Sequence, residues 1–190
     1  MDAFKIAIKL FASQDVFEPS EFVAIFQRWI QNQALADHLL IDVADYAHVV
    51  DGPGTVLVTS QANLSTDRTG GKLGLVYFRK LPIDGAFHDR LRKVMADALK
   101  AAMLLENEPS LKGRLSFKTN EWLFRLSDRL LSPNTSETFE RVKPELEGLT
   151  RVLYGEPAAL EHKPSPLTLF EVHVKASQSP PIKTLLERLG

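Results

Sequence analysis

Two hydrophobic periodicities alternate along this chain, and their order constrains the folds that it can adopt. From Phe4 to Leu10, apolar residues alternate with Lys5, Ala7 and Lys9, and this period of two predicts a strand with one apolar and one wetter face. After Pro19, apolar and aromatic residues recur at helical spacing as far as about Gln33, which predicts an amphipathic helix that Ser20 caps. A chain that switches between these patterns combines strands and helices.

The same two criteria predict the elements in the middle of the chain. Strands are predicted over residues 39–43, 55–59 and 73–78, with a long polar loop over residues 61–71. A helix is predicted over residues 84–106, followed by a short strand over residues 114–118. Asn120 is then a natural N-cap for a further helix, whose apolar stripe consists of Trp122, Leu123, Leu126 and Leu130.

The last third of the chain shows one more helical pattern and one more strand. Helical spacing from Phe139 to Leu153 continues through Pro144, which indicates either one kinked helix or the start of a second, and Gly155 is expected to end it. The last strand is predicted over residues 167–175. The tail that follows could form a short helix, because four of its apolar residues fall on one side.

This order of elements resembles that of an elaborated ferredoxin-like sandwich. It predicts an α+β fold with a mainly antiparallel sheet of about five to six strands and helices packed on one face. We expect a single α+β domain over residues 1–178 and a C-terminal tail over residues 179–190. Folds of this kind host many unrelated functions, so the function must be argued from a site.

Composition excludes several classes of function. The chain has no cysteine, which removes disulfides, thiolate metal sites and cysteine nucleophiles. Its 23 Lys and Arg residues against 24 Asp and Glu give a net charge of −1, which lacks the basic surplus that nucleic-acid binding needs. No apolar run approaches the roughly 18 residues of a membrane span, and the N-terminus alternates charged with apolar residues. We therefore expect a cytoplasmic protein with neither nucleic acid nor membrane as its partner.

One segment gathers side chains that could bind a metal ion. Asp42, Asp45, His48 and Asp51 follow one another at intervals of three, next to a turn rich in Gly and Pro. Imidazole and carboxylate ligands suit a divalent ion such as iron, zinc or manganese. A spacing of three brings side chains together on a helix but not on a strand, so the alternative is an ordinary solvated connection with Asp51 starting its turn.

Two further groups of residues could bind a ligand. The helix predicted at Asn120 would offer free N–H groups to a phosphate or carboxylate, with Lys118 and Arg125 as basic neighbours. The alternative is ordinary helix-surface charge. His173, on the wetter face of the last predicted strand, could be a base held in a cleft or an exposed polar residue.

Three functions follow from these observations. The leading hypothesis is a small-ligand-binding or protein-interaction domain that self-associates, with the apolar tail packed on a second subunit. The second is a metal-dependent enzyme centred on residues 42–51, in which His48 and two of the carboxylates hold the ion and the remaining carboxylate acts as general base. The third is a structural subunit of a larger assembly.

Overall fold

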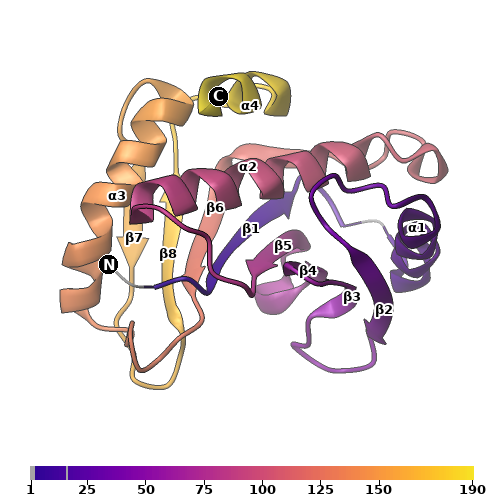
Figure 1. The fold of residues 1–190 in the computed structure, drawn as a ribbon, viewed down its shortest axis with the longest axis horizontal. Coiled ribbons are helices and arrows are strands. Elements are labelled where there is room, and N and C mark those ends of the chain that lie inside the picture. The colour runs from indigo at the N-terminus through magenta and orange to yellow at the C-terminus, as the bar shows by residue number, and fades with distance from the viewer. Residues whose placement is uncertain (1–2, 16) are drawn as a thin grey trace.

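The computed structural model of the protein describes residues 3–15 and 17–190. Over these residues the chain forms one antiparallel sheet of eight strands, four α-helices and two short 3₁₀ turns (Figure 1). The strands lie in the order β2-β3-β4-β5-β1-β6-β8-β7, so that β2 and β7 are the edges. Their bounds are β1 Ile6–Ala12, β2 Leu40–Tyr46, β3 Gly54–Thr59, β4 Ala62–Asp67, β5 Gly74–Arg79, β6 Phe117–Leu126, β7 Ala159–His162 and β8 Phe170–Lys175. The helical elements are α1 Pro19–Asn32, η1 Thr69–Gly71, α2 Phe87–Glu106, η2 Pro109–Leu111, α3 Ser136–Tyr154 and α4 Ile182–Leu189.

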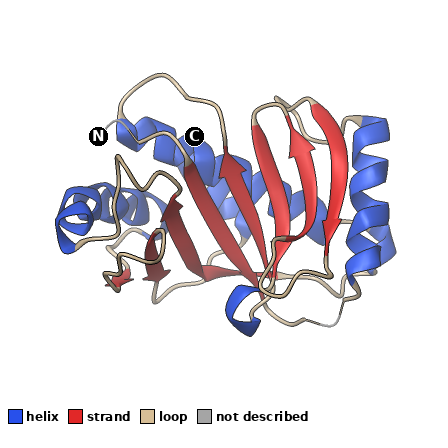
Figure 2. Ribbon diagram, turned by 90° about the horizontal axis from the view of Figure 1, so that it is seen from below, coloured by secondary structure: helices blue, strands red, loops and turns tan. Residues whose placement is uncertain are grey.

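The α-helices cover one face of the sheet and share one hydrophobic core with it. α1 packs against β2 and β3, α2 crosses β1 and β5, and α3 contacts β7. Seen from below, the strands lie in front of the long helix α2 (Figure 2). Among the described residues, no helix covers the opposite face, which is called the open face below.

Apart from the helix predicted from Asn120, the predicted helices form, with small changes at their ends. The N-cap of α1 is Glu18 rather than the predicted Ser20, and the helix begins at Pro19, because Glu18 and Glu21 make a reciprocal capping box. α3 is a single helix that continues through Pro144, and it ends at Gly155, whose φ of 82° confirms the predicted stop.

The C-terminal tail forms α4, which packs on α2 and α3 of the same chain. Its Ile182, Leu185 and Leu189 are buried in the common core. Arg92 donates to the carbonyl of Leu189, and this hydrogen bond holds the end of the tail against α2. These apolar side chains therefore pack within the same chain. They do not form the exposed apolar surface from which self-association was predicted.

Two strands form where the sequence patterns predicted a loop and a helix. Residues 62–67, predicted as part of a loop, form β4 and pair with both β3 and β5. Residues 120–126, predicted as the start of a helix, belong instead to β6, where Trp122, Phe124 and Leu126 are buried with a period of two. The helix prediction was wrong because a short apolar run fits both periods, and here pairing with β1 and β8 decides between them.

The α+β class and the antiparallel sheet are confirmed, with eight strands in place of the predicted five to six. β7, an edge strand of four residues, was not predicted at all. The ferredoxin-like arrangement stays a prediction. Within residues 3–15 and 17–190, none of the helices combines the length and the apolar character needed to cross a membrane.

Candidate functional site

A row of side chains, polar except for Leu123, crosses four strands on the open face. Lys9 of β1 lies opposite Leu123 of β6, Leu123 lies opposite His173 of β8, and His173 lies opposite Glu161 of β7. Directly opposite residues of neighbouring strands point to the same face of a sheet. Two residues further along β6, Arg125 lies opposite Glu171 of β8 and therefore joins this group.

The open face is hollowed at this row by a pocket of about 580 Å³. Its strand residues are Leu123, Arg125, Glu161, Glu171 and His173, and its other lining residues, from connecting segments, are Thr69, Asn134, Lys163, Thr168 and Leu169. A pocket of this size suits a small molecule. Its lining is mostly polar, with Leu123 and Leu169 as its apolar residues. It is called the β6–β8 pocket below.

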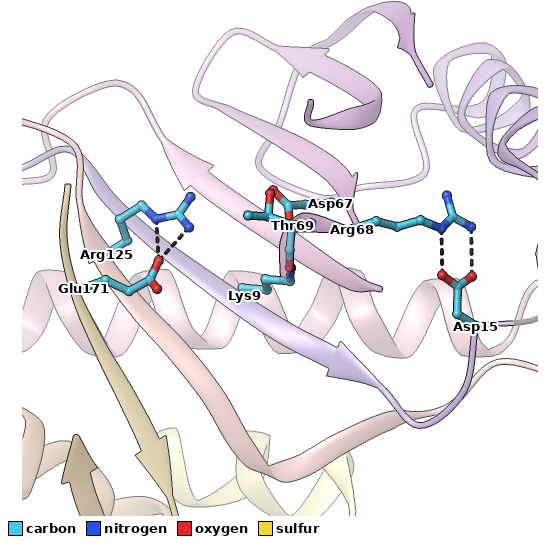
Figure 3. Close-up of polar contacts among 7 residues, drawn as sticks. All are labelled: Lys9, Asp15, Asp67, Arg68, Thr69, Arg125 and Glu171. Atoms are coloured by element: carbon cyan, nitrogen blue, oxygen red, sulfur yellow. Dashed lines mark hydrogen bonds and ion pairs between the residues drawn. The ribbon is translucent and has the colours of Figure 1, made fainter. Parts of the chain in front are cut away.

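Arg125 and Glu171 form an ion pair in the β6–β8 pocket (Figure 3). The guanidinium donates from Nε at 2.8 Å and from Nη2 at 2.6 Å, and both hydrogen bonds end on the same carboxylate oxygen, Oε2 of Glu171. The two side chains keep 26% and 35% of their surface exposed. They are therefore held in place and still reachable from solvent.

His173 lies between two carboxylates. Its Nε2 is 2.9 Å from Oε1 of Glu121, and its Nδ1 is 3.9 Å from Oε2 of Glu161. Lys118 donates to Glu121 at 2.9 Å, and this hydrogen bond, aided by the positive charge of Lys72, lowers the pKa of Glu121 in spite of its burial. The Glu121 carboxylate is thus kept charged and orients the imidazole of His173.

One wall of the pocket is positioned by a buried ion pair. Lys9 Nζ is 2.5 Å from Asp67 Oδ1, and their side chains are only 4% and 10% exposed. Asp67 also accepts hydrogen bonds from the backbone N–H and the hydroxyl of Thr69, which lines the pocket. Figure 3 shows this group beside Arg125 and Glu171, and in the same turn Arg68 binds Asp15. The strands thereby fix the η1 turn at the edge of the pocket.

Asn134 holds a second wall of the pocket. Its Nδ2 donates to Thr168 Oγ1 at 2.8 Å, and its Oδ1 is 2.7 Å from Nε2 of His162. His162 stacks on the ring of Phe139, with 4.9 Å between the ring centroids. Burial lowers the pKa of His162, which favours the neutral imidazole that can donate its one N–H to Asn134. These contacts tie the connection between β6 and α3 to the connection between β7 and β8.

The three residues predicted to bind a ligand all lie in or beside β6, and the helix N-terminus on which the prediction rested is absent there. Arg125 lines the β6–β8 pocket. Lys118 is bound to Glu121, beside His173, while the backbone carbonyl of Asn120 accepts from Ala176 of the neighbouring chain segment. The structure therefore places Arg125 in the pocket and gives Lys118 and Asn120 supporting contacts.

The four predicted metal ligands lie at the edge strand β2 and in the turn that follows it, and all of them are exposed. Asp42 accepts the N–H of Val43 at 2.8 Å, and Asp45 accepts the N–H of Ala47 at 2.9 Å. Within residues 3–15 and 17–190, no three His, Cys, Asp or Glu side chains are gathered closely enough to hold a metal ion, and this includes His48 and Asp51. The metal site stays a prediction that this geometry does not support.

A second polar cluster lies on the helix-covered side of the sheet. Tyr77 OH is 2.8 Å from Nε2 of His38 and 3.2 Å from Oδ2 of Asp97, and Lys93 Nζ donates to Oδ1 of Asp97 at 2.6 Å. Burial and the charge of Asp97 raise the pKa of Tyr77, so its hydroxyl remains protonated. These groups satisfy one another, and the cluster joins β5 to α2.

The sequence patterns missed Glu171, Asn134, Thr168 and Thr69 as pocket residues. The period of two in the last strand was the one usable signal, because it puts Glu171 and His173 on the same wetter face. Asn134, Thr168 and Thr69 come from three separate connections, and only the fold brings them together.

The pocket offers guanidinium, ammonium, imidazole, carboxylate and amide groups, which bind polar ligands through hydrogen bonds, many of them charge-assisted. In comparisons with known proteins, no family model, no curated protein and no solved structure matches this chain.

Proposed function

We propose that this protein binds a small polar molecule in the β6–β8 pocket. The observation that carries the proposal is a pocket of about 580 Å³ on the open face, with the Arg125–Glu171 ion pair among its lining residues. Polar groups that converge in a concave site can fix the orientation of a ligand, and charged groups make the stronger hydrogen bonds. The Lys9–Asp67 pair and the Asn134 contacts support the proposal, since they hold the pocket walls before any ligand arrives.

The proposal is tested by screening a fragment library against the ¹⁵N-labelled full-length chain by NMR. We expect some fragments to shift the backbone signals of Leu123, Arg125, Glu171 and His173 in a saturable manner. The alternative, a protein-interaction domain without a small ligand, predicts no saturable shifts at these residues. That result would overturn the proposal.

Two neighbouring leucines offer a matched pair of variants. Leu169 lines the pocket, whereas Leu167 is 82% exposed and is not among the lining residues. Leu169→Trp should fill the pocket and abolish fragment binding, and Leu167→Trp, with the same change of volume in the same connection, should leave it intact. Equal binding by both variants would show that the fragments bind elsewhere.

A further inference from the structure

We infer that the ligand carries an ammonium and a carboxylate close together, as an α-amino acid does, because the guanidinium of Arg125 and the carboxylate of Glu171 stand side by side in the pocket. The inference rests on the proposed function and names the ligand class of the same site. Its physical basis is that the ion pair leaves one nitrogen of the guanidinium and one oxygen of the carboxylate without a hydrogen-bond partner among the described residues.

Each partner of this ion pair keeps one end free. Nε and Nη2 of Arg125 both bind Oε2 of Glu171. Across residues 3–15 and 17–190, no hydrogen bond or ion pair occupies Nη1 of Arg125 or Oε1 of Glu171. A guanidinium has five N–H donors, and a carboxylate has about four acceptor positions, so both groups can take a further partner. The pair thus presents a donor for an anion next to an acceptor for a cation.

The other charged residues that line the pocket also include one of each sign. Lys163 and Glu161 contribute one further cation and one further anion. Lys175 binds Glu161 at 3.1 Å and lowers the pKa of its carboxylate, which therefore remains charged. A phosphate or another simple anion would face two carboxylates, and a simple cation would face Arg125 and Lys163. A dipolar ligand matches both signs at once.

The spacing of the free groups favours charges that are close together in the ligand. Arg125 and Glu171 are directly opposite each other on β6 and β8, and their charged groups are in contact at 2.6 Å, so the free donor and the free acceptor belong to adjoining groups. In an α-amino acid a single carbon separates the ammonium from the carboxylate. A long ω-amino acid would carry its second charge beyond this pair.

The experiment is an NMR titration of the full-length chain with the common α-amino acids, each beside its N-acetyl derivative and its carboxamide. The readouts are the Nε–H signal of Arg125 and the backbone signals of the pocket. We expect at least one free amino acid to bind, and both of its blocked forms to bind at least about tenfold more weakly, because each has lost one charge contact. An N-acetyl acid that binds as tightly as the free amino acid would identify an anion site and overturn the inference, and an equally tight carboxamide would do so for a cation site.

Two charge-neutralising variants assign the contacts. Glu171→Gln should weaken binding of the free amino acid and bring its affinity close to that of the N-acetyl form, while Arg125→Gln should do the same relative to the carboxamide. Arg28→Gln, which removes the ion pair between Arg28 and Glu108 away from the pocket, is the matched control and should change neither affinity. Binding that is unaffected by both pocket variants would overturn the inference. If fragments occupy the pocket but no amino acid does, the ligand class is wrong and the proposed function stands; if fragments do not bind either, the proposed function fails.

Discussion

The ammonium of Lys9 and the carboxylate of Asp67 are 2.5 Å apart, although β5 separates the strands that carry them. Gly74 of β5 lies opposite Asp67 and opposite Phe11 of β1, and the Lys9 side chain passes over it. A side chain at position 74 would occupy the path that Lys9 follows. One glycine thus permits an ion pair between residues 58 positions apart, and that pair fixes Thr69 at the pocket.

Loss of one partner of this buried pair should strongly destabilise the fold. Lys9→Met leaves the Asp67 carboxylate buried without its cation, and we expect the free energy of unfolding to fall by about 3–5 kcal/mol. Lys9→Met combined with Asp67→Asn should cost less, because the amide oxygen of Asn can still accept from Thr69. Urea denaturation of the single and double variants measures both effects, and a Lys9→Met variant within about 0.5 kcal/mol of the parent would contradict a role for the pair.

Gly74 should not tolerate even the smallest side chain. A Cβ at this position would lie 2.7 Å from Lys9 Cε and 2.7 Å from the carbonyl oxygen of Leu10. Since the second contact is with backbone, we expect Gly74→Ala to lower the free energy of unfolding by about 1–3 kcal/mol. Gly148→Ala in α3, where a Cβ meets nothing within 4 Å, is the control and should instead stabilise the helix by about 0.5–1 kcal/mol. Equal effects of the two variants would rule out the close approach as the cause.

The spacing of apolar residues predicted the elements in which that spacing is regular along the sequence. β1 alternates in its sequence and forms as a strand in the middle of the sheet, but Ile6 to Phe11 are buried on both faces, so the wetter face predicted for it is absent. α2 keeps one continuous buried face over 20 residues. β4 escaped prediction because its inward positions include Ala62 and Thr66, whose weak hydrophobicity conceals the alternation. β7 is too short and too exposed to produce a pattern.

The site was less predictable than the fold because it has no local motif. Arg125 was singled out as a basic residue, but for a helix N-terminus that does not exist. Its partner Glu171 lies 46 residues away, and only the pairing of β6 with β8 brings them together. The Asp42 to Asp51 segment shows the converse case, since residues evenly spaced in the sequence are spread along an edge strand and a turn.

Tyr154 links α3 to β6 through two hydrogen bonds. Its hydroxyl donates to the carbonyl of Thr119 at 2.7 Å and accepts from Trp122 Nε1 at 3.1 Å. Burial raises the pKa of Tyr154 to about 12, so the hydroxyl can donate over the whole physiological range. Tyr154→Phe leaves both partners unsatisfied in the core, and we expect a loss of about 1–3 kcal/mol in thermal or urea unfolding. A loss well below this range would mean that water replaces the hydroxyl.

His162 should make the stability of the protein depend on pH. Its pKa is lowered from 6.5 by burial, so the unfolded chain takes up a proton at a higher pH than the folded chain does. The folded protein therefore loses stability as the pH falls below about 6.5, and it has the full contribution of His162 above that pH. His162→Gln should reduce the fall in the free energy of unfolding between pH 7.5 and pH 5, measured in urea. His88→Gln, at an exposed position of α2, is the control, and an unchanged pH dependence in the His162 variant would contradict the assignment.

Asp42 and Asp45 should keep the edge strand β2 from pairing with other chains. Their carboxylates accept backbone N–H groups of Val43 and Ala47, and they place negative charge along an edge that also exposes Ile41. Charged side chains on an exposed edge are a common protection against strand addition. The double variant Asp42→Val and Asp45→Thr removes both charges and raises strand propensity, and we expect it to form dimers or larger species in light scattering at concentrations where the parent does not change. Asp84→Val, which exposes a valine away from the edge before α2, should behave like the parent. If both variants associate equally, general surface hydrophobicity is the cause, and the two aspartates have no specific role at the β2 edge.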